Sequence, residues 1–227
     1  MIKFSDFLVN HLLNEAPNNS RLYRTSFQEQ SSKEERAKIH ESRSGVDSAA
    51  RKTFQSYVKT SSVVNPAEVD RNETPRNKQR REEFQHHFHR AVGKNADEND
   101  MHSLGSGHIF RGQAHPPDLD ADGYMVTRRA TSWSTEPSVA NANARRNQND
   151  HTSAHHIIVL HHRNETGHRI VSLAAKGHAD VGMSKEGEVV SGPGRYKILK
   201  SEPVGHDALN NKPIIKHTIE YHDSNVN

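Results

Sequence analysis

The chain has 227 residues, 31% of them hydrophobic, with no cysteine and a formal net charge of +3. The absence of cysteine excludes disulfides, a thiol nucleophile and a cysteine-type zinc site, and no apolar run approaches the ~18 residues that a membrane span needs. The net charge is too small to indicate nucleic-acid binding by itself, so nucleic acid as a partner is neither indicated nor excluded. A mean hydropathy of −0.95 predicts that part of the chain packs weakly.

Residues 1–15 predict a short amphipathic helix, because Phe4, Leu8 and Leu12 recur at four-residue spacing. Polar residues interrupt its apolar side, which makes the segment a poor secretory signal. One interpretation is an N-terminal helix that docks on the body of the protein. The other is a leader, or propeptide, that is removed during maturation.

The tripeptide Leu13-Asn14-Glu15 supports the second interpretation. Together with the helix before it, it resembles the N-terminal leaders of proteins packaged in the heads of large tailed phages, whose prohead proteases cut after Leu-x-Glu or Ile-x-Glu. Ile39-His40-Glu41 is a weaker match. The resemblance implies cleavage after Glu15 by a phage prohead protease. It also implies that the protein resides in the virion interior and, after injection, in the host bacterial cytoplasm.

The next three segments are predicted from polarity and helical spacing. Residues 16–46 are polar and charge-mixed, which indicates a linker or a loosely docked helix. A helix from Asp47 to about Lys59 and a second helix over about 76–93 follow. Their apolar faces carry Ala50, Phe54, Tyr57 and Val58 in the first helix, and Phe84, Phe88 and Val92 in the second. We interpret these aromatic side chains as core contacts, not cofactor contacts.

Beyond Gly105 the apolar clusters become short and β-like, and turn residues separate them. The clusters are His108 to Phe110, Ile157 to Leu160, Ile170 to Leu173, Val189 to Val190, Tyr196 to Leu199, and Ile215 to Tyr221. No βαβ rhythm and no internal repeat is present. The pattern therefore predicts an α+β fold with a mixed, mainly antiparallel sheet assembly and helices packed outside it.

Two features suggest a metal site without supporting one. The chain has 18 histidines, but pairs such as His155-His156 point to opposite faces of a strand, so solvated or pH-responsive histidines are the favoured interpretation. Asp118 to Gly123 copies the start of a calcium-binding loop, yet the twelfth position is Arg129 where a glutamate belongs. We expect a solvated turn there and no metal in the protein.

Three short motifs in the β part carry polar chemistry. Arg111-Gly112 ends a short β run, where the arginine suits phosphate oxygens and the glycine lets a ligand approach the backbone. Ser132-Trp133-Ser134 places two hydroxyls around an aromatic before a turn and a helix, and simple helix capping is its alternative explanation.

Glu186 and Glu188, on either side of Gly187, form the third motif. Side chains two apart on a strand share a face, so the spacing predicts two carboxylates directed into the same space. Paired carboxylates can divide acid, base and charge-stabilising roles. The alternative is a solvated pair on an edge strand.

Taken in this order, the motifs resemble the R-S-E class of mono-ADP-ribosyltransferases. The matching residues are Arg111-Gly112, Ser132-Trp133-Ser134 with Pro137 and Ala140, and Glu186-Gly187-Glu188 with Pro193-Gly194. The resemblance covers residues 47–222 as one domain, with a helical part over 47–100 and a β core over 101–222. It implies a mixed, mainly antiparallel β-sandwich with N-terminal helices packed against it.

The resemblance implies transfer of ADP-ribose from NAD⁺, the substrate, to arginine of host proteins. Glu188 would stabilise the cationic ribose, Ser132 would orient Glu188, Arg111 would hold the pyrophosphate and Glu186 would act toward the acceptor. The residues implied to contact NAD⁺ are Arg111, Gly112, Ser132, Trp133, Ser134, Arg145 and Glu188. The alternatives are an inactive structural or DNA-associated head protein and a secreted bacterial toxin.

The sequence departs from the family pattern at two places, and one loop is expected to cover the site. Trp133 replaces the family's middle threonine, and its side chain is expected to point away from the site. Residues 176–185 lack the aromatic that many relatives use to hold the acceptor. Residues 141–153 are expected to form a loop that places Arg145 over the phosphates, and a basic solvated loop is the alternative.

Overall fold

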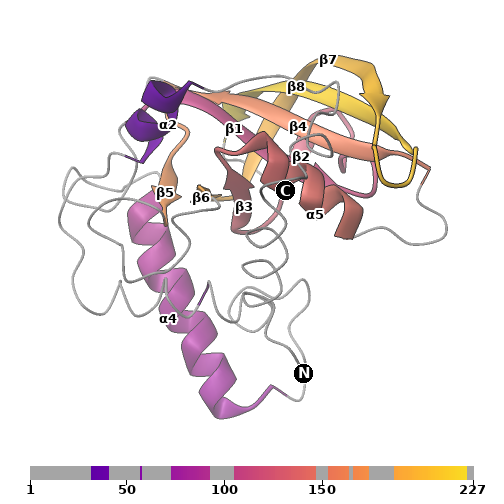
Figure 1. Cartoon of the computed structure of the whole chain (residues 1–227). Helices are drawn as coiled ribbons and strands as arrows, with labels where there is room; N and C mark the ends of the chain where they lie inside the picture. The colour runs from indigo at the N-terminus through magenta and orange to yellow at the C-terminus, as the bar shows by residue number, and fades with distance from the viewer. Residues whose placement is uncertain are drawn as a thin grey trace, which may run out of the picture.

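The computed structural model describes residues 32–40, 57, 73–92, 105–146, 153–163, 166–173 and 187–223 (Figure 1). The predicted leader at 1–15, the helix at 47–59 apart from Tyr57, and Glu186 lie outside the described residues. The elements are α2 (Lys33–Ile39), α4 (Pro75–Val92), β1 (Gly107–Gln113), β2 (Met125–Thr127), β3 (Thr131–Ser134), α5 (Pro137–Arg146), β4 (His155–His162), β5 (Ile170–Ser172), β6 (Glu188–Ser191), β7 (Gly194–His206) and β8 (Pro213–Asp223).

Each helix starts where local chemistry favours it. At the start of α2, the Ser32 hydroxyl accepts from the Glu35 amide at 3.1 Å, and the Glu35 carboxylate accepts from the Ser32 amide at 3.0 Å. This reciprocal pair is a capping box. The helix α5 begins at Pro137, whose fixed φ suits a first helical position. The structure confirms the helix predicted over 76–93 as α4, with Phe84 and Phe88 buried and stacked.

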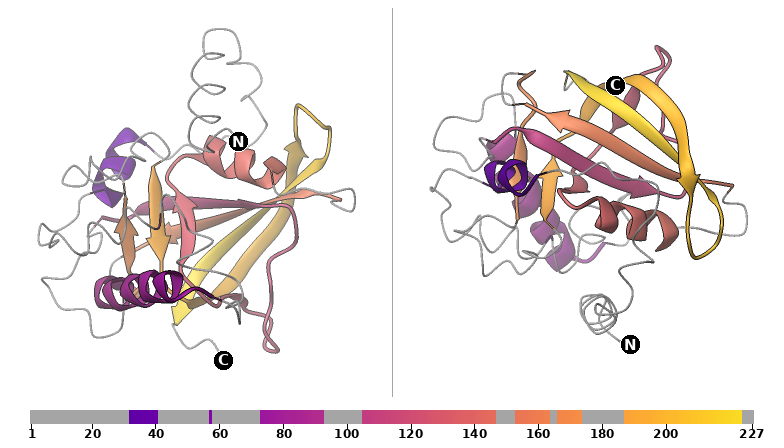
Figure 2. Two further views of the ribbon diagram at one scale, coloured as in Figure 1. Left: turned by 90° about the horizontal axis from the view of Figure 1, so that it is seen from below. Right: turned by 45° about the horizontal axis from the view of Figure 1, so that its top comes forward.

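The eight strands form one sheet in the order β2-β7-β8-β4-β1-β3-β6-β5. Every neighbouring pair is antiparallel except β4 and β8, which run parallel. Only Phe110 and Ser134 are in register between β1 and β3, and beyond this point β5 and β6 run steeply across β1 and β4 (Figure 2). This confirms the predicted mixed, mainly antiparallel fold, in which the sheet bends over its own core.

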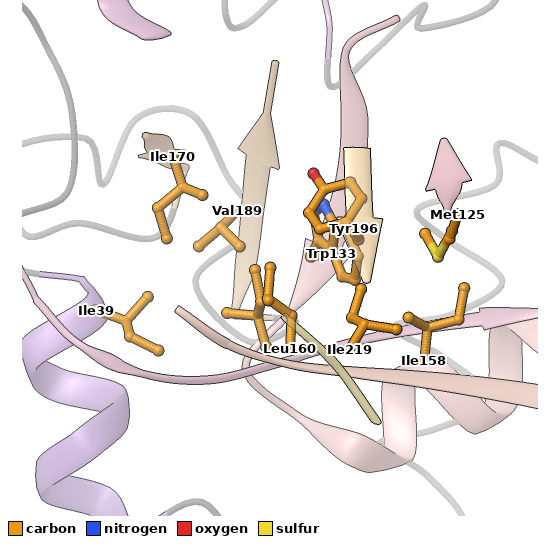
Figure 3. Packing of buried hydrophobic residues seen from close by; sticks show 10 residues of the cluster. Ile39, Met125, Trp133, Ile158, Leu160, Ile170, Val189, Tyr196 and Ile219 are labelled. Carbon is orange, nitrogen blue, oxygen red and sulfur yellow. The ribbon is translucent and has the colours of Figure 1, made fainter. Parts of the chain in front are cut away.

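The main core fills the space inside this bend. Its side chains come from α2 and from strands on both sides of the bend: Ile39, Ile109, Met125, Trp133, Ile158, Leu160, Ile170, Val189, Tyr196 and Ile219 (Figure 3). Burial of each large apolar side chain contributes roughly 1.5–3 kcal/mol. Because β3 and β6 form part of this core, the polar residues on them are held on a rigid support.

A second cluster lies between α5 and the other face of β1 and β4. Ala140 and Ala144 of α5 pack there against Phe110, Ile157 and Val159. A Cβ on Gly112 would lie 1.6 Å from the Ala140 carbonyl oxygen, so only glycine permits this packing. The sequence interpretation that Gly112 opens the backbone to a ligand is wrong on this face, because α5 occupies the space.

Of the two interpretations of the histidines, solvated or pH-responsive, the structure excludes the first for five of them. His155, His156, His162, His168 and His217 are all buried. The strand β4 lies between β1 and β8 and is covered on both faces, so both members of the pair His155-His156 are enclosed. His156 Nδ1 is 2.9 Å from His217 Nε2. The histidines His86 and His89 of α4 are exposed, as predicted.

The turn at Asp118 to Gly123 holds its carboxylates against an arginine. The Asp120 carboxylate accepts from the amides of Asp122 and Tyr124, and Arg195 donates to Asp120 at 2.8 Å and to Asp122 at 2.9 Å. Within the ranges that the structure describes, no three histidine, aspartate or glutamate side chains are grouped to hold a metal ion. None of the helices in those ranges has the length and apolarity that a membrane crossing requires.

Candidate active site

The site is built on the adjacent antiparallel strands β3 and β6. Ser134 lies opposite Glu188 in the register. Ser132, two residues earlier on β3, therefore lies on the same face of the sheet as Ser134 and Glu188. The Ser132 hydroxyl donates to Glu188 Oε1 at 2.9 Å. The structure therefore brings together the serine and the second glutamate that the sequence singled out, and fixes the orientation of the carboxylate.

Arg111 reaches the same serine from β1. Its guanidinium donates to the Ser132 carbonyl oxygen at 3.0 Å. Burial lowers the pKa of the Arg111 guanidinium, but arginine keeps its proton in proteins. A fixed positive charge thus lies beside the Ser132–Glu188 pair, and its remaining donors suit phosphate oxygens.

Tyr57 is the site residue that the sequence did not reveal. Its hydroxyl lies 2.6 Å from the Ser132 hydroxyl, and its ring stacks on Phe84 of α4 with centroids 4.9 Å apart. Burial, aided by the negative charge of Glu188, raises the pKa of Tyr57 to about 12. The phenol therefore keeps its proton, and it donates to Ser132 while Ser132 donates to Glu188.

The sequence placed Tyr57 on an apolar helix face, and in the structure it is indeed buried. The signal that it does more was available but weak. A tyrosine among phenylalanines needs a hydrogen-bond partner for its hydroxyl once it is buried. No sequence rule identifies Ser132, 75 residues away, as that partner.

Replacing Tyr57 with phenylalanine should weaken the support of Ser132 and Glu188 without disturbing the aromatic stack, and so slow the reaction that the sequence resemblance implies. The lost hydrogen bond is worth about 0.5–1.5 kcal/mol, which predicts a fall in kcat of about two- to tenfold. The measurement is steady-state release of nicotinamide from NAD⁺, the substrate that the sequence resemblance implies. Tyr124→Phe, which removes the hydroxyl of a tyrosine whose ring lies under the Arg195 guanidinium, is the control; equal kcat for Tyr57→Phe and wild type would contradict the role of Tyr57.

A left-handed glycine brings the chain into β6. Gly187 has φ +54°, and its carbonyl accepts from the Thr135 amide at 2.9 Å. A Cβ at Gly187 would lie 2.1 Å from Thr135 Oγ1. Because β6 begins only at Glu188, the alternation rule for strands does not apply across Gly187. Strand alternation therefore gives no support to the alignment of Glu186 with Glu188, and because Glu186 lies outside the described residues, that alignment stays a prediction.

The side chains of Trp133 and Ser134 contact other residues of the protein. Trp133 points away from the site, as expected, and is only 2% exposed in the core, where its indole N–H donates to Ser191. The prediction that Trp133 contacts NAD⁺ is therefore wrong for its side chain. Ser134 is buried, and its hydroxyl accepts from the Glu136 amide. The contact lies in the turn that leads into α5, before the helix begins at Pro137, so it is not the helix cap that the sequence offered as an alternative.

Arg145 does not lie on a loop over the site. The helix α5 continues to Arg146, because its alanine-rich sequence favours helix over 141–146, the first part of the loop predicted at 141–153. Arg145 Nε donates to the buried carboxylate of Asp207 at 2.5 Å. The structure thus gives Arg145 a partner in the loop between β7 and β8, not the predicted position over phosphates.

Comparisons with known proteins place the fold. No protein-family model matches the chain, and no curated protein matches it in sequence. Among solved structures, the ADP-ribosyltransferase Vis in complex with agmatine is similar over 87% of this chain and 89% of its own, with a TM-score of 0.51 and 15% identity. The chain has the ADP-ribosyltransferase fold.

A second solved structure supports the same fold. Plx2a, an ADP-ribosyltransferase toxin from Paenibacillus larvae, is similar over 78% of this chain and 88% of its own, with a TM-score of 0.50 and 9% identity. On this ADP-ribosyltransferase fold, the described polar cluster consists of Tyr57, Arg111, Ser132 and Glu188. It offers one carboxylate, one fixed cation and a chain of two hydroxyls, which fits a ligand that carries phosphates and a sugar.

Proposed function

We propose that the protein is an NAD⁺-dependent mono-ADP-ribosyltransferase of the R-S-E class that modifies arginine. The observation that carries the proposal is the 2.9 Å hydrogen bond from Ser132 to Glu188, with Arg111 and Tyr57 bound to the same serine. The ADP-ribosyltransferase fold supports it.

The reaction breaks the bond between nicotinamide and ribose and forms a bond from ribose to the acceptor nitrogen. Nicotinamide leaves with the bonding electron pair, so positive charge develops on the ribose. The Glu188 carboxylate, held by Ser132, stabilises that charge at the moment it forms. Arg111 neutralises pyrophosphate charge, and the acceptor loses one proton when the new bond is made.

Arginine is the favoured acceptor because a guanidinium suits a carboxylate partner. Glu186, one residue before the turn at Gly187, is the residue we assign to hold the acceptor and remove its proton. Vis was solved with agmatine, a compound that carries a guanidinium group. This supports a guanidinium as the acceptor class on this fold.

Glu186→Ala should separate transfer from hydrolysis. Loss of the acceptor-side carboxylate is expected to lower transfer to agmatine by about 100-fold, while hydrolysis of NAD⁺ by water continues, since Glu188 is intact. Both rates are measured in one reaction from nicotinamide release and agmatine consumption. An equal fall in both rates would contradict an acceptor-side role for Glu186.

The acceptor is tested by incubating adenine-labelled NAD⁺ with a bacterial lysate and the protein. We expect labelled host proteins, modified at arginine in peptide mass spectra, and competition by agmatine. Labelling confined to other side chains would overturn the arginine assignment. Label recovered in nucleic acid instead would make nucleic acid the acceptor.

For delivery, we propose packaging in a phage head, followed by entry into the host cytoplasm with the DNA. The leader and the Leu13-Asn14-Glu15 tripeptide support this. The expected N-terminus in virions is Ala16, as read by intact mass. A secreted bacterial toxin is the second candidate, favoured by the similarity to Plx2a, which is itself a toxin; detection in culture medium and absence from virions would favour it.

A further inference from the structure

The helix α2 packs directly on the part of the protein that carries the site. Its residue Ile39 is fully buried in the main core and points toward Ile170 and Val189 (Figure 3). A Cβ on Gly107 would lie 2.8 Å from Ile39 Cδ1, and one on Gly105 would lie 1.6 Å from the Lys38 carbonyl oxygen. The segment 16–46, expected to be a linker or loosely docked, thus contains a closely packed helix.

His40, immediately after α2, joins two segments that are far apart in sequence. Its Nδ1 lies 2.6 Å from the Ser172 hydroxyl at the end of β5, and its Nε2 lies 3.1 Å from the Thr135 hydroxyl just after β3. Ser172 and Thr135 are both fully buried. One imidazole therefore connects the two segments that flank the start of β6.

These two segments hold the backbone on either side of the Glu188 side chain. The Thr135 amide donates to the Gly187 carbonyl, and the Leu173 amide, next to Ser172, donates to the Glu188 carbonyl, each at 2.9 Å. Because both carbonyls are fixed, the direction in which the Glu188 side chain leaves β6 is fixed as well. His40 binds the side chain of Thr135, whose amide makes the first contact, and the side chain of Ser172, which directly precedes the Leu173 amide of the second contact.

A second contact attaches α2 to the same segment. Arg36 donates to the Glu136 carboxylate at 2.7 Å, and Glu136 follows Thr135 directly. This ion pair is partly exposed, so it contributes little stability by itself. Arg36 and His40, four residues apart, thus contact Glu136 and Thr135, two consecutive residues between β3 and α5.

We infer that α2 holds β3 and β6, the strands that carry Ser132 and Glu188, in their relative position, and we call α2 a clamp in this sense. His40 is the positioning residue through which α2 orients Glu188. Burial, followed by the charge of Arg36, lowers the pKa of His40 to about 4, so the ring is neutral near pH 7. A neutral imidazole has one donor and one acceptor nitrogen on opposite sides of the ring. It can therefore bridge two hydroxyls that a glutamine, with both polar atoms at its tip, cannot hold together.

The test compares His40→Gln with His156→Gln. His156 is the matched control, since burial lowers its pKa to about 4 as it does for the partly buried His40, but its hydrogen bond goes to His217 on β8. Hydrogen exchange is measured at the amides of Thr135 and Leu173. We expect faster exchange at both amides in His40→Gln only; faster exchange in both variants or in neither would overturn the inference.

Turnover gives an independent measurement that rests on the proposed function. His40→Gln should lower kcat for nicotinamide release by about ten- to 100-fold, since misplaced catalytic groups cost this much, and should leave KM for NAD⁺ unchanged. His156→Gln should keep kcat while lowering the melting temperature. An unchanged kcat in His40→Gln would overturn the positioning role. A wild type without turnover would contradict the proposed function, and hydrogen exchange would still decide whether the clamp exists.

Ser172→Ala keeps the test decisive if His40→Gln does not fold. It removes one hydroxyl that His40 binds and leaves α2 intact, so exchange at Leu173 should become faster and kcat should fall, as in His40→Gln. Wild-type values for both would overturn the inference.

If α2 acts as a clamp, cleavage at the two protease tripeptides has different consequences for activity. Cleavage after Glu15 leaves α2 attached to the body, whereas cleavage after Glu41 cuts the chain just behind His40. Recovery of active protein that begins at Ser42 would contradict the clamp.

Discussion

Glu188→Gln is expected to lower kcat for nicotinamide release by about 1,000-fold, a loss of the size seen when one electrostatic contact to a transition state is removed. Glutamine retains an oxygen that can accept from the Ser132 hydroxyl, so the side chain stays in place while its charge disappears. Glu188→Ala should be at least as damaging. Nicotinamide release under saturating NAD⁺ measures both variants.

The fold should survive these changes. Glu188 is partly exposed at the first position of β6, and the adjacent Val189 and Val190, not Glu188, enter the core. The thermal midpoint is therefore expected to remain close to that of the wild type. Full turnover by a folded Glu188→Gln protein would remove Glu188 from the mechanism.

The protein should lose stability between about pH 6.5 and pH 4, by an amount of order a few kcal/mol. Burial lowers the pKa of His40 and of His156 from 6.5 to about 4, and the pKa values of His155, His168 and His217 are lowered as well. As the pH falls below 6.5, the unfolded chain takes up protons on these rings and the folded chain does not. Unfolding is therefore favoured progressively, while stability above this window is independent of these histidines.

Urea unfolding midpoints at about pH 7 and about pH 5 measure this effect. His156→Gln should reduce the loss between the two conditions because glutamine takes up no proton. His89→Gln, which changes an exposed residue of α4, should leave the loss unchanged. A wild-type midpoint that is the same at both pH values would contradict the role of the buried histidines.

The strands and the long helix could be predicted because their signals are local. Phe84 and Phe88 recur at helical spacing, and the apolar clusters of β4 and β8 are bounded by turn residues. The order of Arg111, Ser132 and Glu188 also preserved a recognisable pattern, and the structure brings these three residues together.

Other features depend on tertiary contacts that have no period in the sequence. Tyr57 is indistinguishable from a core aromatic until Ser132 is seen beside it. His40 lies in a polar stretch, and its partners follow it by 95 and 132 residues. Gly187 breaks the alternation on which the pairing of Glu186 with Glu188 was based. The helix α5 extends to Arg146, into the segment 141–153 that the family resemblance predicted as a loop.

The proposed transfer of ADP-ribose to a guanidinium is tested most directly by mass analysis of a reaction that contains the wild-type protein, NAD⁺ and agmatine. We expect ADP-ribosyl-agmatine and free nicotinamide, with no such product when Glu188→Gln replaces the wild type. Intact NAD⁺ and unmodified agmatine after incubation with the folded wild-type protein would contradict it.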